Sequence, residues 1–150
     1  MNLPFTDLIS PATPLDIRVS YSEVDRMDVV YYGNYLRWFE MGRAEYLRSR
    51  GKTYRKIEED GYLLPVIEAY VRYRQSAHYD DLVVVWTIPQ TITQAKVTFA
   101  YKVERKNDGL LLAEGHTIHA CRGPRGKIVR FPQQILDLLM QPYRQLGCFP

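Results

Sequence analysis

One long helix-forming segment, residues 34–50, constrains the fold of this chain more than any other part of the sequence. It contains no proline and is rich in Leu, Arg, Glu and Met, which favour a helix, and Gly51 is placed to end it. One stripe along this helix consists of Tyr35, Phe39, Gly42 and Tyr46. Because Gly42 and Ala44 are small, the helix backbone can approach a sheet closely there. An apolar stripe on a single long helix has to be covered by other elements.

The rest of the chain has mainly the patterns of strands separated by turns. Alternating or continuous apolar residues predict strands at 15–21, 64–74, 82–88, 96–104, 110–121 and 128–130. The nearly continuous apolar run at 82–88 favours burial on both faces, and Asn107–Gly109 favours a hairpin turn. We expect a helical turn near 53–60 and a closing helix that Pro132 begins and Pro142 stops. This order predicts an α+β domain with an antiparallel sheet packed on a central helix.

The length of 150 residues suffices for one globular domain with its own core, but not for a second catalytic domain. Residues 1–14 contain three prolines, and we expect them to form an irregular arm. Residues 15–150 are then expected to form a single domain. An active site that needs two walls has to take its second wall from elsewhere.

Charge and cysteine content narrow the possible partners and location. Lys and Arg number 20 and Asp and Glu 17, and a net charge of +3 is too small by itself to indicate nucleic-acid binding. Two cysteines, Cys121 and Cys148, cannot build the disulfide framework of a small secreted domain. The first 17 residues lack a basic start, and the longest apolar run, residues 82–86, is far shorter than the ~20 residues of a membrane span. We therefore expect a soluble cytoplasmic protein.

Several catalytic patterns are absent from the sequence. It contains no Gly-x-Ser-x-Gly elbow, no Gly-x-Gly-x-x-Gly and no P-loop. His116, His119 and Cys121 lie within six residues, but on a regular strand His119 and Cys121 share one face while His116 points to the other. We therefore expect neither a metal site nor a bound cofactor.

The connection between the first expected strand and the long helix has an unusual composition. Asp25 and Asp28 lie just before the helix start, where backbone N–H groups lack partners and the helix dipole favours negative charge. An anion or a developing oxyanion can be held at such a place. The alternative is that Asp25, Asp28 and Asn34 are only turn and capping residues.

The same region resembles a known family over most of its length. Residues 19–51 read VSYSEVDRMDVVYYGNYLRWFEMGRAEYLRSRG, and similarity continues through residues 64–87 and 111–132. The chain resembles the 4-hydroxybenzoyl-CoA thioesterase family of the hot-dog fold, especially its Tol–Pal-associated and acyl-CoA thioesterase branch. The resemblance covers about residues 15–140. It implies an antiparallel sheet wrapped around a long central helix.

The resemblance also implies roles for two residues in the hydrolysis of an acyl-CoA thioester to a free acid and coenzyme A. Asp25 corresponds to the catalytic carboxylate, which acts as a nucleophile or as a general base for water. The backbone N–H of Tyr32 corresponds to the amide that polarises the carbonyl. Two positions depart from the family pattern: Asp28 stands where many relatives have Gly, and Tyr32 stands where the Tol–Pal-associated branch commonly has His.

Coenzyme A carries phosphates, so the resemblance implies a basic rim near the site. Candidates are Arg122, Arg125 and Lys127, with Arg74 as a further one, and each of them is otherwise a solvated surface charge. Glu68 is a candidate for the acyl pocket or for a structural partner of an arginine.

Partners and rival functions follow from the same resemblance. Coenzyme A and acyl carrier protein both remain as the thiol carrier, and a homodimer or homotetramer is expected, with no nucleic acid. The second copy would supply the missing wall of the site. One rival is a hot-dog hydratase or dehydratase, which usually requires a His that the Asp25 loop lacks. The other rival is a non-catalytic protein that binds acyl thioesters.

Overall fold

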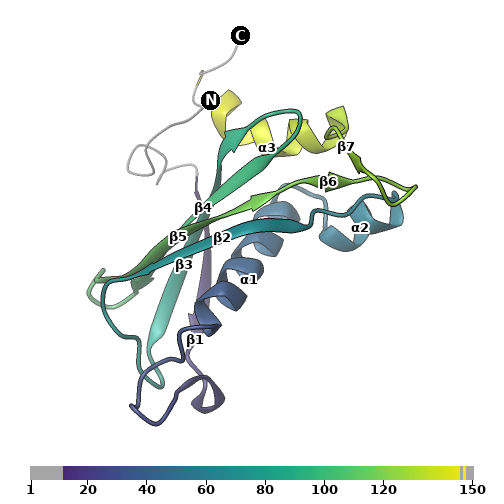
Figure 1. Cartoon of the computed structure of the whole chain (residues 1–150). Helices are drawn as coiled ribbons and strands as arrows, with labels where there is room; N and C mark the ends of the chain where they lie inside the picture. The colour runs from purple at the N-terminus through teal and green to yellow at the C-terminus, as the bar shows by residue number, and fades with distance from the viewer. Residues whose placement is uncertain (1–11, 146, 148–150) are drawn as a thin grey trace.

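A curved antiparallel sheet wraps around one long helix in the computed structural model, which describes residues 12–145 and 147 (Figure 1). The helix is α1 (Asn34–Ser49). The sheet has the order β1 (Thr13–Arg18), β3 (Leu82–Ile92), β4 (Val97–Arg105), β5 (Leu111–His119), β2 (Val66–Tyr73), with every neighbouring pair antiparallel. This arrangement confirms the predicted α+β hot-dog architecture.

Shorter elements close the ends of this layer. They are the 3-10 helix η2 (Tyr21–Glu23), α2 (Tyr54–Glu59), the small hairpin of β6 (Cys121–Arg122) and β7 (Ile128–Val129), and α3 (Gln133–Gln145). The β6–β7 hairpin lies beside α2, far from the loop that leads into α1 (Figure 1). Within the described part of the chain, no helix is long and apolar enough to cross a membrane.

Two of the predicted boundaries are wrong at the sheet. The first strand already begins at Thr13, so the arm expected at 1–14 ends earlier, and its residues 1–11 lie outside the described residues. Pro14 is accommodated because β1 pairs only with β3, so its missing N–H breaks no second ladder. β3 continues past Pro89 to Ile92, with an irregular register between Pro89 and Thr91. A register irregularity of this kind lets a strand pass a proline.

The closing helix also differs from the prediction, because Pro142 lies inside α3 instead of ending it. A proline within a helix leaves the carbonyl four residues earlier without its usual N–H donor. That carbonyl belongs to Leu138, and the Tyr46 hydroxyl of α1 donates to it at 2.9 Å. A long-range hydrogen bond therefore replaces the missing helical one.

The central helix lies against the sheet at two glycines. A Cβ atom added at Gly42 would stand 2.4 Å from Oγ1 of Thr87, and one added at Gly115 would stand 2.1 Å from the carbonyl oxygen of Tyr70. The space beside Gly115 lets Phe39 of α1 stack on Tyr101 of β4, with ring centroids 4.2 Å apart and planes within 5°. The predicted close approach of the helix at Gly42 is thus confirmed.

A chain of buried polar groups crosses the core beneath the helix. The Arg43 guanidinium donates to the Tyr101 hydroxyl at 3.2 Å, and that hydroxyl and Thr117 Oγ1 are 2.7 Å apart. Thr117 Oγ1 lies 2.8 Å from Nε2 of His119, whose Nδ1 lies 3.0 Å from the carbonyl oxygen of Leu64. Burial, together with the nearby Arg43 charge, lowers the pKa of His119 to about 4, so the ring is neutral at pH 7.

Replacing Gly42 by Ala should destabilise the protein by up to about 2 kcal/mol. The new methyl group collides with Thr87, and overpacking of this kind costs about 1–3 kcal/mol, which exceeds the gain of about 1 kcal/mol in helix propensity. Urea unfolding followed by circular dichroism measures the difference. In the Thr87→Ala background, which removes the nearest atom, the same replacement should cost less. An increase in stability on Gly42→Ala would contradict the packing described for α1.

Buried His119 should make stability depend on pH. Its folded pKa of about 4 lies below the unfolded value of about 6.5, so the unfolded chain binds more protons in this window. The stabilisation that His119 contributes to the free energy of unfolding is complete above pH ~6.5. About 3 kcal/mol of it should be lost as the pH drops to about 4. The measurement is urea unfolding across this range.

The His119→Gln variant should lose most of that pH dependence, whatever its absolute stability. The matched control is His116→Gln, on the same strand but with a half-buried ring on the other face, which should keep it. An unchanged pH dependence in His119→Gln would show that another group titrates.

Candidate active site

The loop between β1 and α1 is held by a buried glutamate, Glu23. Its carboxylate accepts hydrogen bonds from the Trp38 indole N–H at 2.7 Å and from the Ser20 backbone N–H at 2.9 Å. Its backbone carbonyl accepts from the Tyr31 N–H and the Asn34 side chain, both at 2.9 Å. Glu23 therefore ties the loop to the first turns of α1. The Ser20-x-x-Glu23 spacing of a capping box is the sequence signal that could have identified it.

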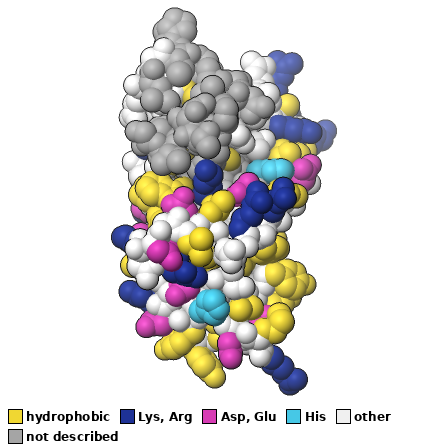
Figure 2. Space-filling view, turned by 90° about the vertical axis from the view of Figure 1, so that its left-hand side faces the viewer, with side chains coloured by type: hydrophobic (Ala, Val, Ile, Leu, Met, Phe, Trp, Pro, Cys, Tyr) yellow, Lys and Arg dark blue, Asp and Glu magenta, His cyan; other side chains and the backbone are white. Residues whose placement is uncertain are grey.

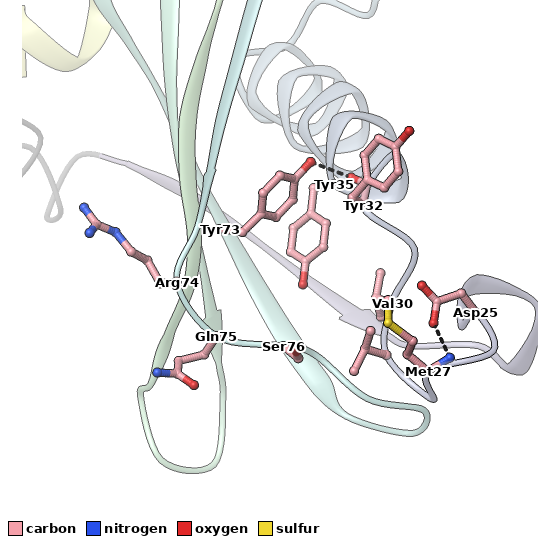
Figure 3. Close-up of a pocket in the computed structure, with 10 residues that line it drawn as sticks. Asp25, Met27, Val30, Tyr32, Tyr35, Tyr73, Arg74, Gln75 and Ser76 are labelled. Carbon is pink, nitrogen blue, oxygen red and sulfur yellow. Dashed lines mark hydrogen bonds between the residues drawn. The ribbon is translucent and has the colours of Figure 1, made fainter.

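A cavity of about 300 Å³ lies where this loop meets the end of β2 (Figure 3). The loop contributes Asp25 and Tyr32, α1 contributes Tyr35, and β2 and the residue after it contribute Tyr73 and Arg74. Cavities of this size are at the lower end of the range for small-molecule sites. The cavity therefore brings a carboxylate and a helix start together, whereas the Arg74 guanidinium points away from Asp25 (Figure 3).

Asp25 sits in a tight turn that leaves part of its carboxylate available. Oδ1 accepts the Met27 backbone N–H at 2.8 Å, while the Asp25 N–H donates to the Val29 carbonyl at 2.9 Å. Within the described part of the chain, Oδ2 has no hydrogen-bond partner. Asp28 is exposed and has a φ of 61°, a left-handed conformation that Gly adopts most easily and Asp tolerates. The backbone thus explains why a glycine suits position 28.

Tyr32 stands at the entrance to α1 with its backbone partly unpaired. Its carbonyl oxygen accepts from the Tyr73 hydroxyl at 2.8 Å and from the Tyr35 N–H at 3.4 Å. Among residues 12–145 and 147, no acceptor takes the Tyr32 N–H. A free N–H at a helix start carries partial positive charge. An anionic oxygen bound in the cavity can accept from it.

Tyr73 and Tyr35 were not singled out from the sequence, yet both line the cavity. Their rings meet edge to face with centroids 5.2 Å apart. Burial raises the pKa of Tyr35, and burial together with the neighbouring Tyr32 raises the pKa of Tyr73, so both hydroxyls are neutral at pH 7. The alternation of β2, which sends Ala69, Val71 and Tyr73 toward the helix, is the signal that could have placed Tyr73.

The other predicted site residues lie in three different places. Arg74 lines the cavity and forms an ion pair with Glu114 at 3.4 Å. Glu68 lies on the outer face of the sheet, 3.2 Å from His116, and does not line the cavity. Arg122, Arg125 and Lys127 lie in and around the β6–β7 hairpin, beyond the other end of α1. Among the described residues, one chain thus brings together only Asp25 and Tyr32, while Arg74 borders their cavity with its guanidinium directed away (Figure 3).

The histidines and the single described cysteine do not form a metal centre. β5 ends at His119, and Ala120 interrupts the strand before buried Cys121 in β6, so the expected strand of 110–121 is divided. In the part of the chain that the structure describes, no three His, Cys, Asp or Glu side chains form a group that could hold a metal ion.

Acidic and basic side chains are interspersed over the face shown in Figure 2.

Comparison with known proteins agrees with this architecture. The thioesterase superfamily profile matches residues 27–112. The acyl-CoA thioesterase YbgC of Haemophilus influenzae is 31% identical over 121 residues, covering 79% of this chain and 88% of that protein. The crystal structure of a hypothetical protein from Thermus thermophilus has a TM-score of 0.81 and 33% identity, covering 85% of this chain and 96% of that one.

A more distant structure supports the fold alone. It is a mutant 4-hydroxybenzoyl CoA thioesterase complexed with 4-hydroxybenzoyl CoA, with a TM-score of 0.78 and 19% identity, covering 86% of this chain and 99% of that one. Together, the profile match and the relative above 30% identity confirm the family that the sequence resembles. The chain belongs to the thioesterase superfamily of thioester hydrolases.

Proposed function

We propose that this protein hydrolyses the thioester of an acyl-CoA to a free carboxylic acid and coenzyme A, in the cavity lined by Asp25 and Tyr32. One observation carries the proposal: within the described part of the chain, a carboxylate oxygen and a backbone N–H that have no hydrogen-bond partner belong to residues lining the same cavity at the start of the long helix. The name of the Haemophilus influenzae relative, an acyl-CoA thioesterase, supports the substrate class.

Two chemical routes fit this arrangement. In one, an Asp25 oxygen attacks the thioester carbonyl, the C–S bond breaks, and water then hydrolyses the resulting anhydride. In the other, Asp25 takes a proton from water, whose oxygen attacks the carbonyl directly, and the C–S bond then breaks to release the coenzyme A thiolate. Both routes place negative charge on the carbonyl oxygen, which the Tyr32 N–H stabilises. The thiolate is a good leaving group, so neither route needs a metal or a strong acid.

The functional unit in this proposal is at least a homodimer that pairs through β2. β2 is an edge strand, hydrogen-bonded only to β5, and seven of its eight residues are exposed. Exposed apolar side chains on it include Val66, Ile67 and Tyr70. A long apolar edge is a template for pairing with another chain. The opposite edge, β1, is less suitable because it is shorter and Pro14 lacks an N–H.

Pairing through β2 would also bring the basic hairpin to a site. An antiparallel pair of identical strands places the start of one beside the end of the other. The start of β2 lies near Arg122, since Leu63 and Arg122 form a backbone bridge. The end of β2 carries Tyr73 and the cavity. Arg122, Arg125 and Lys127 of one copy would therefore flank the cavity of the other, where they can contact the phosphates of coenzyme A.

The positions of the histidines disfavour a hydratase or dehydratase. The chain has three histidines, and none of them lines the cavity that holds Asp25. His119 is buried in the core network, and His116 lies on the outer face of the sheet. The described residues of one chain therefore place no proton-transferring histidine beside the carboxylate.

Replacing Asp25 by Asn should reduce kcat for acyl-CoA hydrolysis by about 100-fold or more, because the amide can neither attack the thioester nor accept a proton from water. Release of the CoA thiol measures the rate with a panel of aliphatic and aromatic acyl-CoA esters and with acyl carrier protein thioesters. The control is Asp28→Asn, in the same loop but exposed, which should keep nearly full activity.

Full turnover by Asp25→Asn on every substrate of the wild type would overturn the assigned role of Asp25. Tight binding of acyl-CoA esters by the wild type without any hydrolysis would instead favour the non-catalytic rival. The two carriers in the panel decide between coenzyme A and acyl carrier protein.

Ile67→Lys should shift the protein toward monomers and lower its activity, because it places a charge on the exposed apolar edge of β2. Light scattering coupled to size exclusion measures the oligomer. The matched control is Ala95→Lys, which places the same charge on the exposed turn between β3 and β4, away from the β2 edge, and should leave the oligomer intact. A monomeric wild type with full activity would contradict the proposed dimer.

A further inference from the structure

We propose that Tyr73 is a positioning residue that holds the Tyr32 backbone in the orientation needed to stabilise the oxyanion. This inference rests on the proposed function and adds a residue to it. The Tyr73 hydroxyl, at the end of β2, donates a hydrogen bond of 2.8 Å to the Tyr32 carbonyl oxygen (Figure 3). It connects the sheet directly to Tyr32, which lines the cavity and whose N–H has no acceptor among the described residues.

The Tyr32 N–H lies in the planar peptide group that it shares with the Tyr31 carbonyl, and the φ and ψ angles of Tyr32 connect that group to the next one. The peptide group before Tyr32 is held on one side, because the Tyr31 carbonyl accepts the Asn34 N–H at 3.0 Å. The Tyr31 N–H donates in turn to the Glu23 carbonyl at 2.9 Å. The peptide group after Tyr32 is held through its carbonyl oxygen. That oxygen accepts a long hydrogen bond from the Tyr35 N–H, at 3.4 Å, and a short one from the Tyr73 hydroxyl, at 2.8 Å. Tyr73 therefore supplies the shorter restraint on this side.

The same hydrogen bond acts on the amide that follows. The Tyr32 carbonyl and the Gly33 N–H belong to one peptide group, and a donor on the carbonyl polarises that N–H. Among the residues described, the Gly33 N–H also has no acceptor. Tyr73 thus orders and polarises the part of the helix start that meets a developing negative charge.

Packing alone does not account for the hydroxyl. The Tyr73 ring already packs edge to face on Tyr35, and a phenylalanine could make the same contact. The side chain is 47% exposed, so water could satisfy the Tyr32 carbonyl in its place. Burial raises the pKa of the hydroxyl, so it remains a donor through neutral pH. The feature that requires tyrosine is therefore the fixed direction of the hydrogen bond.

The expected effect on kcat is scaled from the effect of removing a hydrogen-bond donor to the oxyanion. Removal of one such donor reduces kcat by about 100- to 1,000-fold in enzymes. Loss of a restraint leaves the donor present but less well aligned, so Tyr73→Phe should reduce kcat by about 10-fold, a fraction of the full effect. KM should change little, because the ring that lines the cavity is retained.

The test compares Tyr73→Phe with Tyr79→Phe. Tyr79 is also an exposed tyrosine, but it lies outside β2 and the cavity, and its ring packs edge to face on Tyr21. Tyr79→Phe should keep the wild-type kcat and KM, and both variants should unfold at nearly the same temperature. A fall in kcat confined to Tyr73→Phe supports the positioning role, whereas equal kcat in both variants overturns it.

A second measurement reports on the carbonyl without turnover. Infrared difference spectra of a ¹³C=O-labelled acyl-CoA bound to Asp25→Asn should show the thioester band at lower frequency than in water, because the Tyr32 N–H polarises it. The Asp25→Asn/Tyr73→Phe double variant should lose part of that shift, which a purely structural role would leave unchanged. An equal shift in both proteins overturns the role of Tyr73. A wild type that hydrolyses no thioester overturns the proposed function itself.

Discussion

The close contact between α1 and the sheet at Gly42 fixes where the helix lies. Because Gly42 has no side chain, the helix lies directly on β3. Phe39 then packs beside Gly115 and stacks on Tyr101. The position of the helix axis then fixes where its N-terminus emerges. That N-terminus meets the end of β2, and the cavity lies between them. A bulkier residue at either glycine would separate the helix from the strand that completes the site.

The candidate site depends on two acidic residues of one loop, one of which holds the loop in place while the other faces the cavity. Glu23 is buried, and its hydrogen bonds to Trp38 and to backbone groups hold the loop against the helix. Asp25, two residues later, keeps one carboxylate oxygen free of partners among the described residues. The carboxylate of Glu23 therefore anchors the loop through its hydrogen bonds, and the carboxylate of Asp25 remains available for chemistry.

Sequence patterns predicted the features that depend on local periodicity, and missed those that depend on distant partners. The long helix, the strand series and the importance of Gly42 follow from alternation and residue size. The passage of α3 through Pro142 could not be foreseen, because it depends on the Tyr46 hydroxyl, 92 residues away from Leu138 in the chain. For the site, the resemblance to the family pointed to Asp25 and Tyr32, whose roles stay predictions, whereas the face that Glu68 occupies depends on the strand register with β5.

Strand β2 connects the proposed dimer contact to the candidate active site. Its exposed edge is the surface we assign to a second copy, and its last residue, Tyr73, bonds the backbone of Tyr32. An isolated edge strand is held on one side only, so its end is free to move. Pairing with a second copy would hold both sides and restrict the position of the Tyr73 hydroxyl. The same event that supplies the second wall of the site would therefore also order its oxyanion amide.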